Sequence, residues 1–295
     1  MIKDIAIIFI SIFFESLPFL LLGSLISAII ETFIKDETFE KIIPKNPILG
    51  SIVGIFLGLF LPACDCAVIP VSKRLIKKKV PINVAISFML SSPIINPVVL
   101  LSTYYAFYRT TPEIFWYRLL FGILISLIIG IIMGIIFNKK KVIINNLDEE
   151  CEHCHIHPKG VKYKIKDIFV HTALDMFEVV KYLMIGALIA SIVQVLLPRG
   201  ILTYFNNNQV LSILVLMLFA YLISLCSTSD SFVGRTLLTS FSKTSILAYL
   251  LLGPMIDIKN TFVLCGNFKK SFVITLITLI FITIFIFSMI GVMYI

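Results

Sequence analysis

The stretch Leu61-Pro-Ala-Cys-Asp-Cys-Ala-Val-Ile-Pro70 decides the fold, because it places a helix break inside one of the chain's apolar runs. Proline removes a backbone donor and clashes with the preceding turn, so Pro62 and Pro70, eight positions apart, are expected to interrupt a helix. Backbone groups freed at membrane depth must be satisfied by protein or by a water-filled cavity. The stretch therefore predicts a discontinuous membrane helix that carries Cys64, Asp65 and Cys66 at its break.

The composition is that of a polytopic membrane protein. Of 295 residues, 59% are hydrophobic and 14% are charged, whereas soluble domains are about 25% charged. Mean hydropathy is +1.03, and apolar runs long enough to cross a bilayer recur along the chain. The expected fold class is all-α, with about eight transmembrane helices over Ile5–Ile30, Ile48–Pro70, Val80–Phe107, Phe115–Phe137, Ile168–Leu197, Val210–Val233, Thr244–Leu264 and Ser271–Ile295.

The basic residues predict the orientation of these spans and do not suggest nucleic-acid binding. They gather after the second, fourth and sixth spans, in Lys73–Lys79, Lys139–Lys141 with Lys162, Lys164 and Lys166, and Arg235 with Lys243. Loops rich in Lys and Arg stay in the cytoplasm, so both termini are predicted to be cytoplasmic. Lys269 and Lys270 are the exception, because this topology places them outside.

The two halves of the chain repeat. Residues 15–29 align without gaps to residues 178–192, Cys64 lies opposite Cys226, and Ser92–Asn96 matches Gly253–Asp257. We therefore predict a first transmembrane repeat over residues 1–137, a cytoplasmic linker over 138–167 and a second repeat over 168–295. Four spans per repeat make the two copies parallel, whereas a re-entrant segment in place of one span would invert them.

Each half contains two polar breaks in its apolar runs, at matching positions. Discontinuous helices at matching positions of two repeats indicate a transport site, although proline kinks that merely pack against neighbours are the alternative. The breaks supply the candidate substrate-binding residues Cys64, Asp65, Cys66, Pro93, Asn96, Cys226, Ser229, Asp230 and Asp257.

The cysteines suggest one class of substrate. In a regular helix, residues i and i+2 point about 200° apart, whereas in an extended segment they face the same way. Unwinding between the prolines would let Cys64 and Cys66 face one soft cation or thiophilic solute, with Cys226 as a third thiol. The alternative is that the cysteines are small packing residues and that Asp65 caps a half-helix.

Two acids are candidates for carrying a coupling proton, because intramembrane acids are functional candidates by default. Glu15 and Glu178 occupy equivalent positions of the two halves. Glu178 has Asp175 and Lys181 nearby, so it is alternatively a helix-end residue in water, and Glu15 is the better buried candidate. Asp65, Asp230 and Asp257 are further candidates.

The linker contains a possible metal site formed by Cys151, His153, Cys154, His155 and His157. Thiolates and imidazoles at these spacings suit Zn²⁺ or Cu(I) in a regulatory or delivery role; the alternative is a solvated linker. The chain has no His-Glu-x-x-His, P-loop or Gly-x-Ser-x-Gly signature, so no enzymatic activity or catalytic residue is predicted.

Residues 61–71, Lys73–Lys79 and Ser91–Tyr104 resemble the YraQ/ArsP-like permease family (DUF318), and Leu225–Asp230 and Gly253–Asp257 fit it too. The resemblance covers nearly the whole chain. It implies an eight-span inner-membrane permease. The Ser92-Pro-Ile-Ile-Asn-Pro97 block makes the chain more similar to an uncharacterised branch of the family than to the arsenical branch, and members of that uncharacterised branch are often proposed to act with a second membrane subunit. One branch of the family exports trivalent organoarsenicals, and a related branch is associated with copper or zinc efflux. Efflux of a soft metal or metalloid is thus the leading prediction; a permease or channel for an unrelated solute, or a scaffold subunit with a metal-sensing loop, are the alternatives.

Overall fold

The computed structural model describes residues 2–33, 44, 46–60, 65–137, 142–143, 161–196 and 208–293. These residues are almost entirely α-helical, which confirms the predicted fold class. The helices are α1 (Ile2–Phe33), α3 (Pro47–Phe60), α4 (Asp65–Lys77), α5 (Ile82–Ile95), α6 (Pro97–Phe107), α7 (Glu113–Phe137), α8 (Val161–Leu196), α9 (Gln209–Ile223), α10 (Ser227–Leu237), α11 (Lys243–Met255), α12 (Ile258–Asn267) and α13 (Lys270–Val292).

Helix length decides which helices can cross a membrane. Within the described part of the chain, five helical segments are long and apolar enough, and the bent pair α5–α6 makes a sixth. By contrast, α3 has 14 residues and α9 has 15, which at 1.5 Å per residue gives only about 21–23 Å, less than the hydrocarbon core of about 30 Å. These two helices therefore end inside the membrane.

The helices α3 and α4 form a hairpin that returns to the side on which it started. Asn83, at the start of α5, donates a 2.8 Å hydrogen bond to the carbonyl of Pro47, at the start of α3. Further along, Gly54 contacts Val84 and Gly58 contacts the Ser91–Ser92 turn, so α3 and α5 run parallel. Because α4 lies between them in the chain and leads directly into α5, α4 must run back toward the start of α3.

The second half contains the same hairpin. Ser212, near the start of α9, donates a 2.9 Å hydrogen bond to Ser245, near the start of α11. Gln209 and Thr244, closer still to these two helix starts, are also hydrogen-bonded, at 3.3 Å. The helices α9 and α11 are thus parallel, and α10 returns between them, so α9–α10 is also re-entrant.

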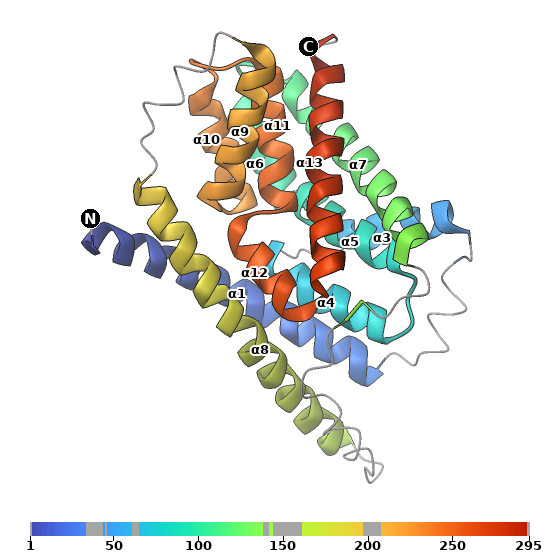
Figure 1. Ribbon diagram of the computed structural model, residues 1–295. Coiled ribbons are helices and arrows are strands. Elements are labelled where there is room, and N and C mark those ends of the chain that lie inside the picture. Colours follow the sequence, from blue (N-terminus) through green and yellow to red (C-terminus); the bar gives the residue numbers. More distant parts are fainter. Residues whose placement is uncertain are drawn as a thin grey trace.

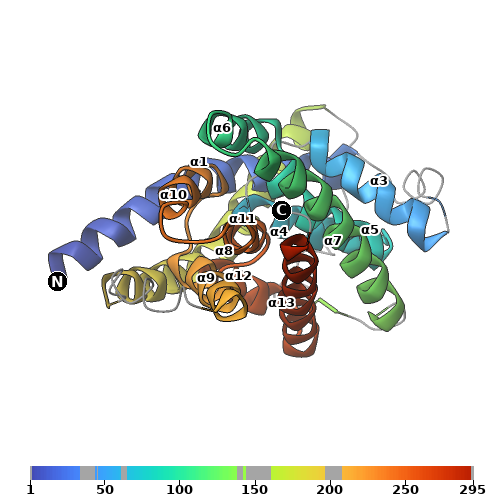
Figure 2. The ribbon, with the colours of Figure 1, turned by 90° about the horizontal axis from the view of Figure 1, so that it is seen from above.

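Equivalent helices of the two halves run in opposite directions (Figures 1 and 2). Between α7 and α13, Phe121 makes an edge-to-face contact with Phe287, and Phe137 makes one with Phe272. In the same way, α1 crosses α8 with its middle against Ala187 and Ala190 and its later part against Asp175. The predicted parallel arrangement is therefore wrong, and the re-entrant alternative holds. The reason is that each hairpin replaces one span, which leaves an odd number of crossings per half.

The helix order α1, α3–α7 recurs as α8–α13. The helix α8 already begins at Val161, inside the segment predicted as a linker. The exact boundaries of the two repeats stay a prediction.

The basic segments lie on one side of the bundle. The amide of Lys269, just before α13, donates a 2.8 Å hydrogen bond to Val142, just after α7, and Ile143 pairs with Phe268. The end of α4 contacts the earlier part of α8 through an ion pair of Lys73 with Glu178. We call this the basic side; it contains the C-terminal ends of α4 and α7 and the N-terminal ends of α8 and α13.

Candidate functional site

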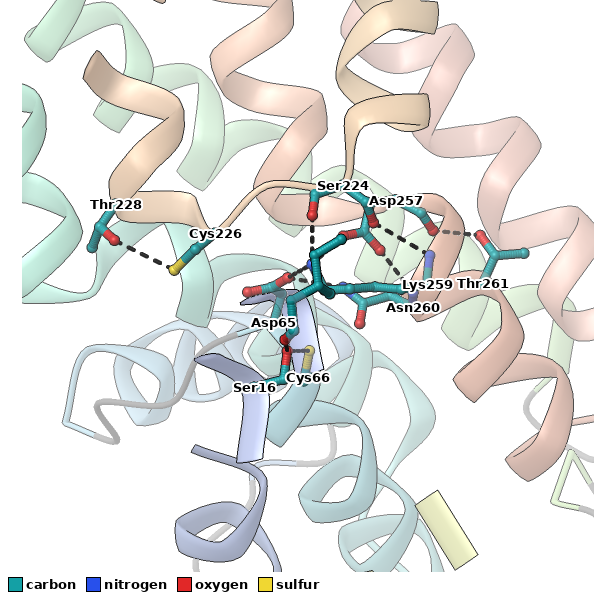
Figure 3. Close-up of polar contacts among 11 residues, drawn as sticks. Ser16, Asp65, Cys66, Ser224, Cys226, Thr228, Asp257, Lys259, Asn260 and Thr261 are labelled. Atoms are coloured by element: carbon teal, nitrogen blue, oxygen red, sulfur yellow. Dashed lines mark hydrogen bonds and ion pairs between the residues drawn. The ribbon is translucent and has the colours of Figure 1, made fainter. Parts of the chain in front are cut away.

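The polar centre of the molecule is a buried cluster formed by the start of α4 and the start of α12 (Figure 3). The ammonium group of Lys259 lies 3.2 Å from a carboxylate oxygen of Asp65 and 2.5 Å from one of Asp257. Asn260 donates a 3.0 Å hydrogen bond to Asp65. All four side chains are at least 95% buried. One ammonium is thus held between two carboxyl groups, so the cluster has one more acidic than basic side chain.

The sequence builds this cluster through helix breaks. Asp257 is extended and caps α12, because its carboxylate accepts a 2.7 Å hydrogen bond from the amide of Asn260. At the equivalent position, Asn96 caps α6 and accepts a 3.0 Å bond from Val98. Side-chain oxygens at this position satisfy amide groups that a helix start leaves without partners. The cap therefore also fixes the Asp257 carboxylate beside Lys259.

The break between α9 and α10 brings a third segment to the cluster. The backbone of Ser224 is left-handed, with φ 56°, which ends α9 and turns its carbonyl to within 3.3 Å of the Lys259 ammonium. Two residues later, Cys226 starts α10 in an extended conformation. Two segments far apart in the sequence, α4 and the α9–α10 break, thereby flank Lys259.

Beside the cluster lies a small cavity of about 20 Å³, which is partly open to the outside. It is lined by Ile12, Glu15, Ser16, Phe19, Asp65, Cys66, Ser224, Cys226 and Lys259. The Cys66 thiol lies 3.9 Å from the hydroxyl of Ser16, and the Cys226 thiol lies 3.3 Å from that of Thr228. Two thiols, two carboxylates and one ammonium therefore share one cavity.

The structure brings four of the predicted site residues, Glu15, Asp65, Cys66 and Cys226, into the cavity wall. Asp257 lies behind the wall, against Lys259. The remaining candidates lie outside the lining: Pro93 is buried within α5, Asn96 caps α6, Ser229 and Asp230 belong to α10, and Glu178 lies on α8.

Some predicted residues fall on parts of the chain that the structure does not describe. These are Cys64 and the five linker residues Cys151, His153, Cys154, His155 and His157. Elsewhere, among the described residues, no group of three or more His, Cys, Asp or Glu side chains is arranged to hold a metal ion. The residues of the cavity wall that the structure describes are therefore not arranged as a metal centre.

A second polar cluster lies away from the cavity, around Arg118 of α7. Its guanidinium donates to Thr103 of α6 and to Ser231 of α10, at 2.5 Å and 2.8 Å. Next to Ser231, Asp230 accepts a 3.0 Å hydrogen bond from Tyr249. Arg118 is fully buried, and its hydrogen bonds join α7 to both α6 and α10 where those two helices pack together. The Arg118 cluster thus holds together α6 and α10, which are the half-helices equivalent to α12 and α4.

Two ion pairs join α4 to α8 at the basic side. Lys73 lies 2.8 Å from Glu178, and Arg74 lies 2.6 Å from Asp175. Both basic side chains are more than 90% buried. Glu178 therefore has a partner 105 residues away, whereas the sequence suggested only Lys181.

Sequence reasoning missed Lys259, Asn260 and Arg118. The sequence did contain a signal for Lys259 and Arg118. A Lys or Arg inside an apolar run is costly in lipid, and it therefore indicates that a polar partner is buried beside it. Lys259 lies two residues after Asp257 in a run otherwise read as a span.

Comparison with known proteins agrees with this architecture. A family model described as a predicted permease, ArsP_1, matches residues 1–292. A protein of Streptococcus mutans serotype c (strain ATCC 700610 / UA159), whose name describes it as a two-component membrane permease complex subunit, is 36% identical over 270 residues, 90% of this chain and 88% of its own. The UPF0718 protein YcgR of Bacillus subtilis (strain 168) is 39% identical over 273 residues, 92% of each chain. No solved structure matches. The chain therefore belongs to the ArsP_1 family of predicted permeases.

Proposed function

We propose that the protein moves a small solute across the plasma membrane through the cavity beside Lys259. The observation that carries this proposal is the convergence of broken helices from both halves on one partly open polar cavity. Sites of this kind, at the interface of repeats and built from half-helix ends, are typical of secondary transporters. A scaffold subunit would not need charged and thiol side chains around a cavity.

The substrate class that we propose is a soft metal or metalloid species, with export as the direction that the family resemblance implies. The support is that Cys66 and Cys226, from two different segments, line the same cavity with Asp65 and Glu15. Thiol sulfur is the protein ligand that soft cations prefer. A transported substrate must also be released. Two thiols that do not complete a metal's ligand set would bind it transiently, whereas a complete ligand set would hold it permanently.

A permease for an unrelated charged solute is the second candidate, and Lys259 favours it. Its ammonium contacts two carboxylates, so a substrate carboxylate or phosphate could replace one of them. A substrate of this kind would depend on Lys259 and not on the two thiols.

We propose that the basic side faces the cytoplasm, because Lys- and Arg-rich loops are retained there. The contacts described above place Lys269 and Lys270 on this side, together with the lysines around residues 73–79. The sequence reading had to treat Lys269 and Lys270 as an exception. In this orientation α1 starts and α13 ends on the opposite side, so both termini lie outside. The proposal reverses the orientation expected from eight spans.

We propose Glu15 as the coupling-proton carrier, because it lines the cavity. The expectation that Glu15 is buried is wrong, since its side chain is exposed. Its counterpart Glu178 is held by Lys73. We also propose a second membrane subunit as partner, in line with the name of the Streptococcus relative. A regulatory Zn²⁺ or Cu⁺ site in the linker remains a proposal that rests on Cys151, Cys154 and the neighbouring histidines.

The experiment is a tolerance and accumulation panel. Cells that lack the protein receive the wild type, Cys66→Ser, Cys226→Ser or the control Cys265→Ser, a cysteine of α12 outside the cavity wall. They are then challenged with trivalent arsenicals, copper and zinc. We expect the wild type and Cys265→Ser to lower intracellular accumulation of at least one species, and the two cavity variants to lose this effect. Unchanged export by both cavity variants would refute the thiol proposal and favour the second candidate.

A further inference from the structure

The two halves are inverted copies, but their packing is not symmetric. The pair α1–α8 packs on α4 and on α12, and makes no comparable contact with the equivalent helices α10 and α6. As a result, α4 buries every residue from Asp65 to Leu75. The equivalent helix α10 buries only Ser227, Asp230, Ser231 and Gly234 among its eleven residues. The described conformation is therefore closed on the basic side, where α4 and α12 lie.

The ion pair that closes this side has an unused counterpart. Lys73 is equivalent to Arg235 of α10, and Glu178 is equivalent to Glu15 of α1, by the alignment of the two halves. Lys73 and Glu178 lie 2.8 Å apart. Arg235 and Glu15 are both exposed, and neither forms an ion pair in the described part of the chain. The pair Glu15–Arg235 thus has the same combination of opposite charges as the pair Glu178–Lys73. An ion pair could therefore form at either place if the helices of the two halves exchanged their packing.

The helix contacts are compatible with such an exchange. Gly186 of α8 lies so close to α12 that a Cβ there would sit 2.7 Å from the Cα of Lys259. The equivalent contact would bring Gly23 of α1 onto Val98 of α6. Val98 is 58% exposed in the described conformation, so this surface is uncovered and available. Glycine at both positions lets two helices approach closely.

We infer that the protein has a second conformation in which α1–α8 packs on α10 and α6, and in which Glu15 pairs with Arg235 while the Lys73–Glu178 pair is broken. This inference rests on the proposed transport function, since a carrier must expose its site to each side in turn. The Glu15–Arg235 pair closes the cavity on the side opposite the basic side. Glu15 and Arg235 are thus gating residues, and the two ion pairs exclude one another.

The test measures proximity and not transport, so it separates this inference from the proposed function. Two double-cysteine variants of the full chain, Lys73→Cys/Glu178→Cys and Glu15→Cys/Arg235→Cys, are treated with a short bifunctional maleimide in native membranes. The cross-linked peptides are then located by mass spectrometry, which distinguishes them from the native cysteines. The control is Ile10→Cys/Arg235→Cys, because Ile10 is also exposed but lies about 140° around α1 from Glu15.

We expect both gating pairs to cross-link. Adding Lys73→Gln and Arg74→Gln to the Glu15→Cys/Arg235→Cys variant should raise its cross-linking several-fold, because loss of the two ion pairs disfavours the described conformation. Cross-linking of Glu15→Cys/Arg235→Cys no higher than in the Ile10 control would overturn the inference, provided that Lys73→Cys/Glu178→Cys cross-links.

Discussion

Replacing Lys259 by Met should strongly destabilise the protein. The substitution roughly preserves volume but removes the only ammonium within the cluster, leaving the carboxyl groups of Asp65 and Asp257 buried side by side without a cationic partner. Removing one partner of a buried ion pair costs about 3–5 kcal/mol. For chains of this size class about 2–4 °C of melting temperature is lost per kcal/mol, so the melting temperature should fall by roughly 6–20 °C.

The assay is thermal unfolding of purified protein in detergent, followed by intrinsic fluorescence. Lys270→Met is the matched control, since Lys270 is exposed on the basic side. Adding Asp65→Asn to Lys259→Met leaves one carboxyl group in the cluster and lets Asn260 keep a hydrogen-bond acceptor at residue 65, so it should recover part of the loss. A Lys259→Met melting temperature equal to that of the control, or a double variant less stable than Lys259→Met, would refute the reasoning.

Four further outcomes are expected. Gly54→Ala should reduce the amount of folded protein in membranes, because its Cβ would meet the Val84 carbonyl oxygen, whereas Ile52→Ala should be tolerated. Arg118→Lys should destabilise the protein by about 2–5 kcal/mol in a detergent melt, since one ammonium cannot reproduce both guanidinium contacts to α6 and α10; a neutral effect would remove Arg118 as a tie. A reporter fused to the C-terminus should be active only when it is of the kind that works outside the cytoplasm, and a reversed pattern would reject the proposed orientation. Glu15→Gln should flatten the pH dependence of export, while retained wild-type pH dependence would exclude Glu15 as the proton carrier.

The class of fold and the position of the helix breaks could be predicted from the sequence, because both depend on local properties. Apolar run length indicates membrane helices, and Pro62, Pro93 and Pro254 with nearby polar residues indicate interruptions. The path of the chain at the first break could not be predicted. Residues 48–70 have the length of one ordinary span, and only the packing of α3 against α5, which the contact of Asn83 with Pro47 begins, reveals that the chain turns back.

The site was predicted in part for a similar reason. Asp65, Cys66 and Cys226 stand out locally as polar or thiol groups in apolar runs, and all three line the cavity. Their partners come from distant parts of the chain, as Asn260 does to Asp65 across 195 residues. Pairing over such separations is set by helix packing, which composition and spacing do not encode.

The inverted arrangement also constrains how the chain is inserted during synthesis. Equivalent connections of the two halves must end on opposite faces of the bilayer. Lys and Arg residues should therefore be favoured in the connection on the cytoplasmic face and disfavoured in its counterpart on the other face. The α4–α5 connection carries Lys78 and Lys79, whereas its counterpart, residues 238–242, contains no basic residue. Conversely, Lys269 and Lys270 stand between α12 and α13, whereas the counterpart, residues 108–112, carries one basic residue, Arg109. Thr239→Lys should therefore hinder translocation of the loop over residues 238–242 and yield misinserted protein, even though Thr239 is exposed at the surface of the folded structure.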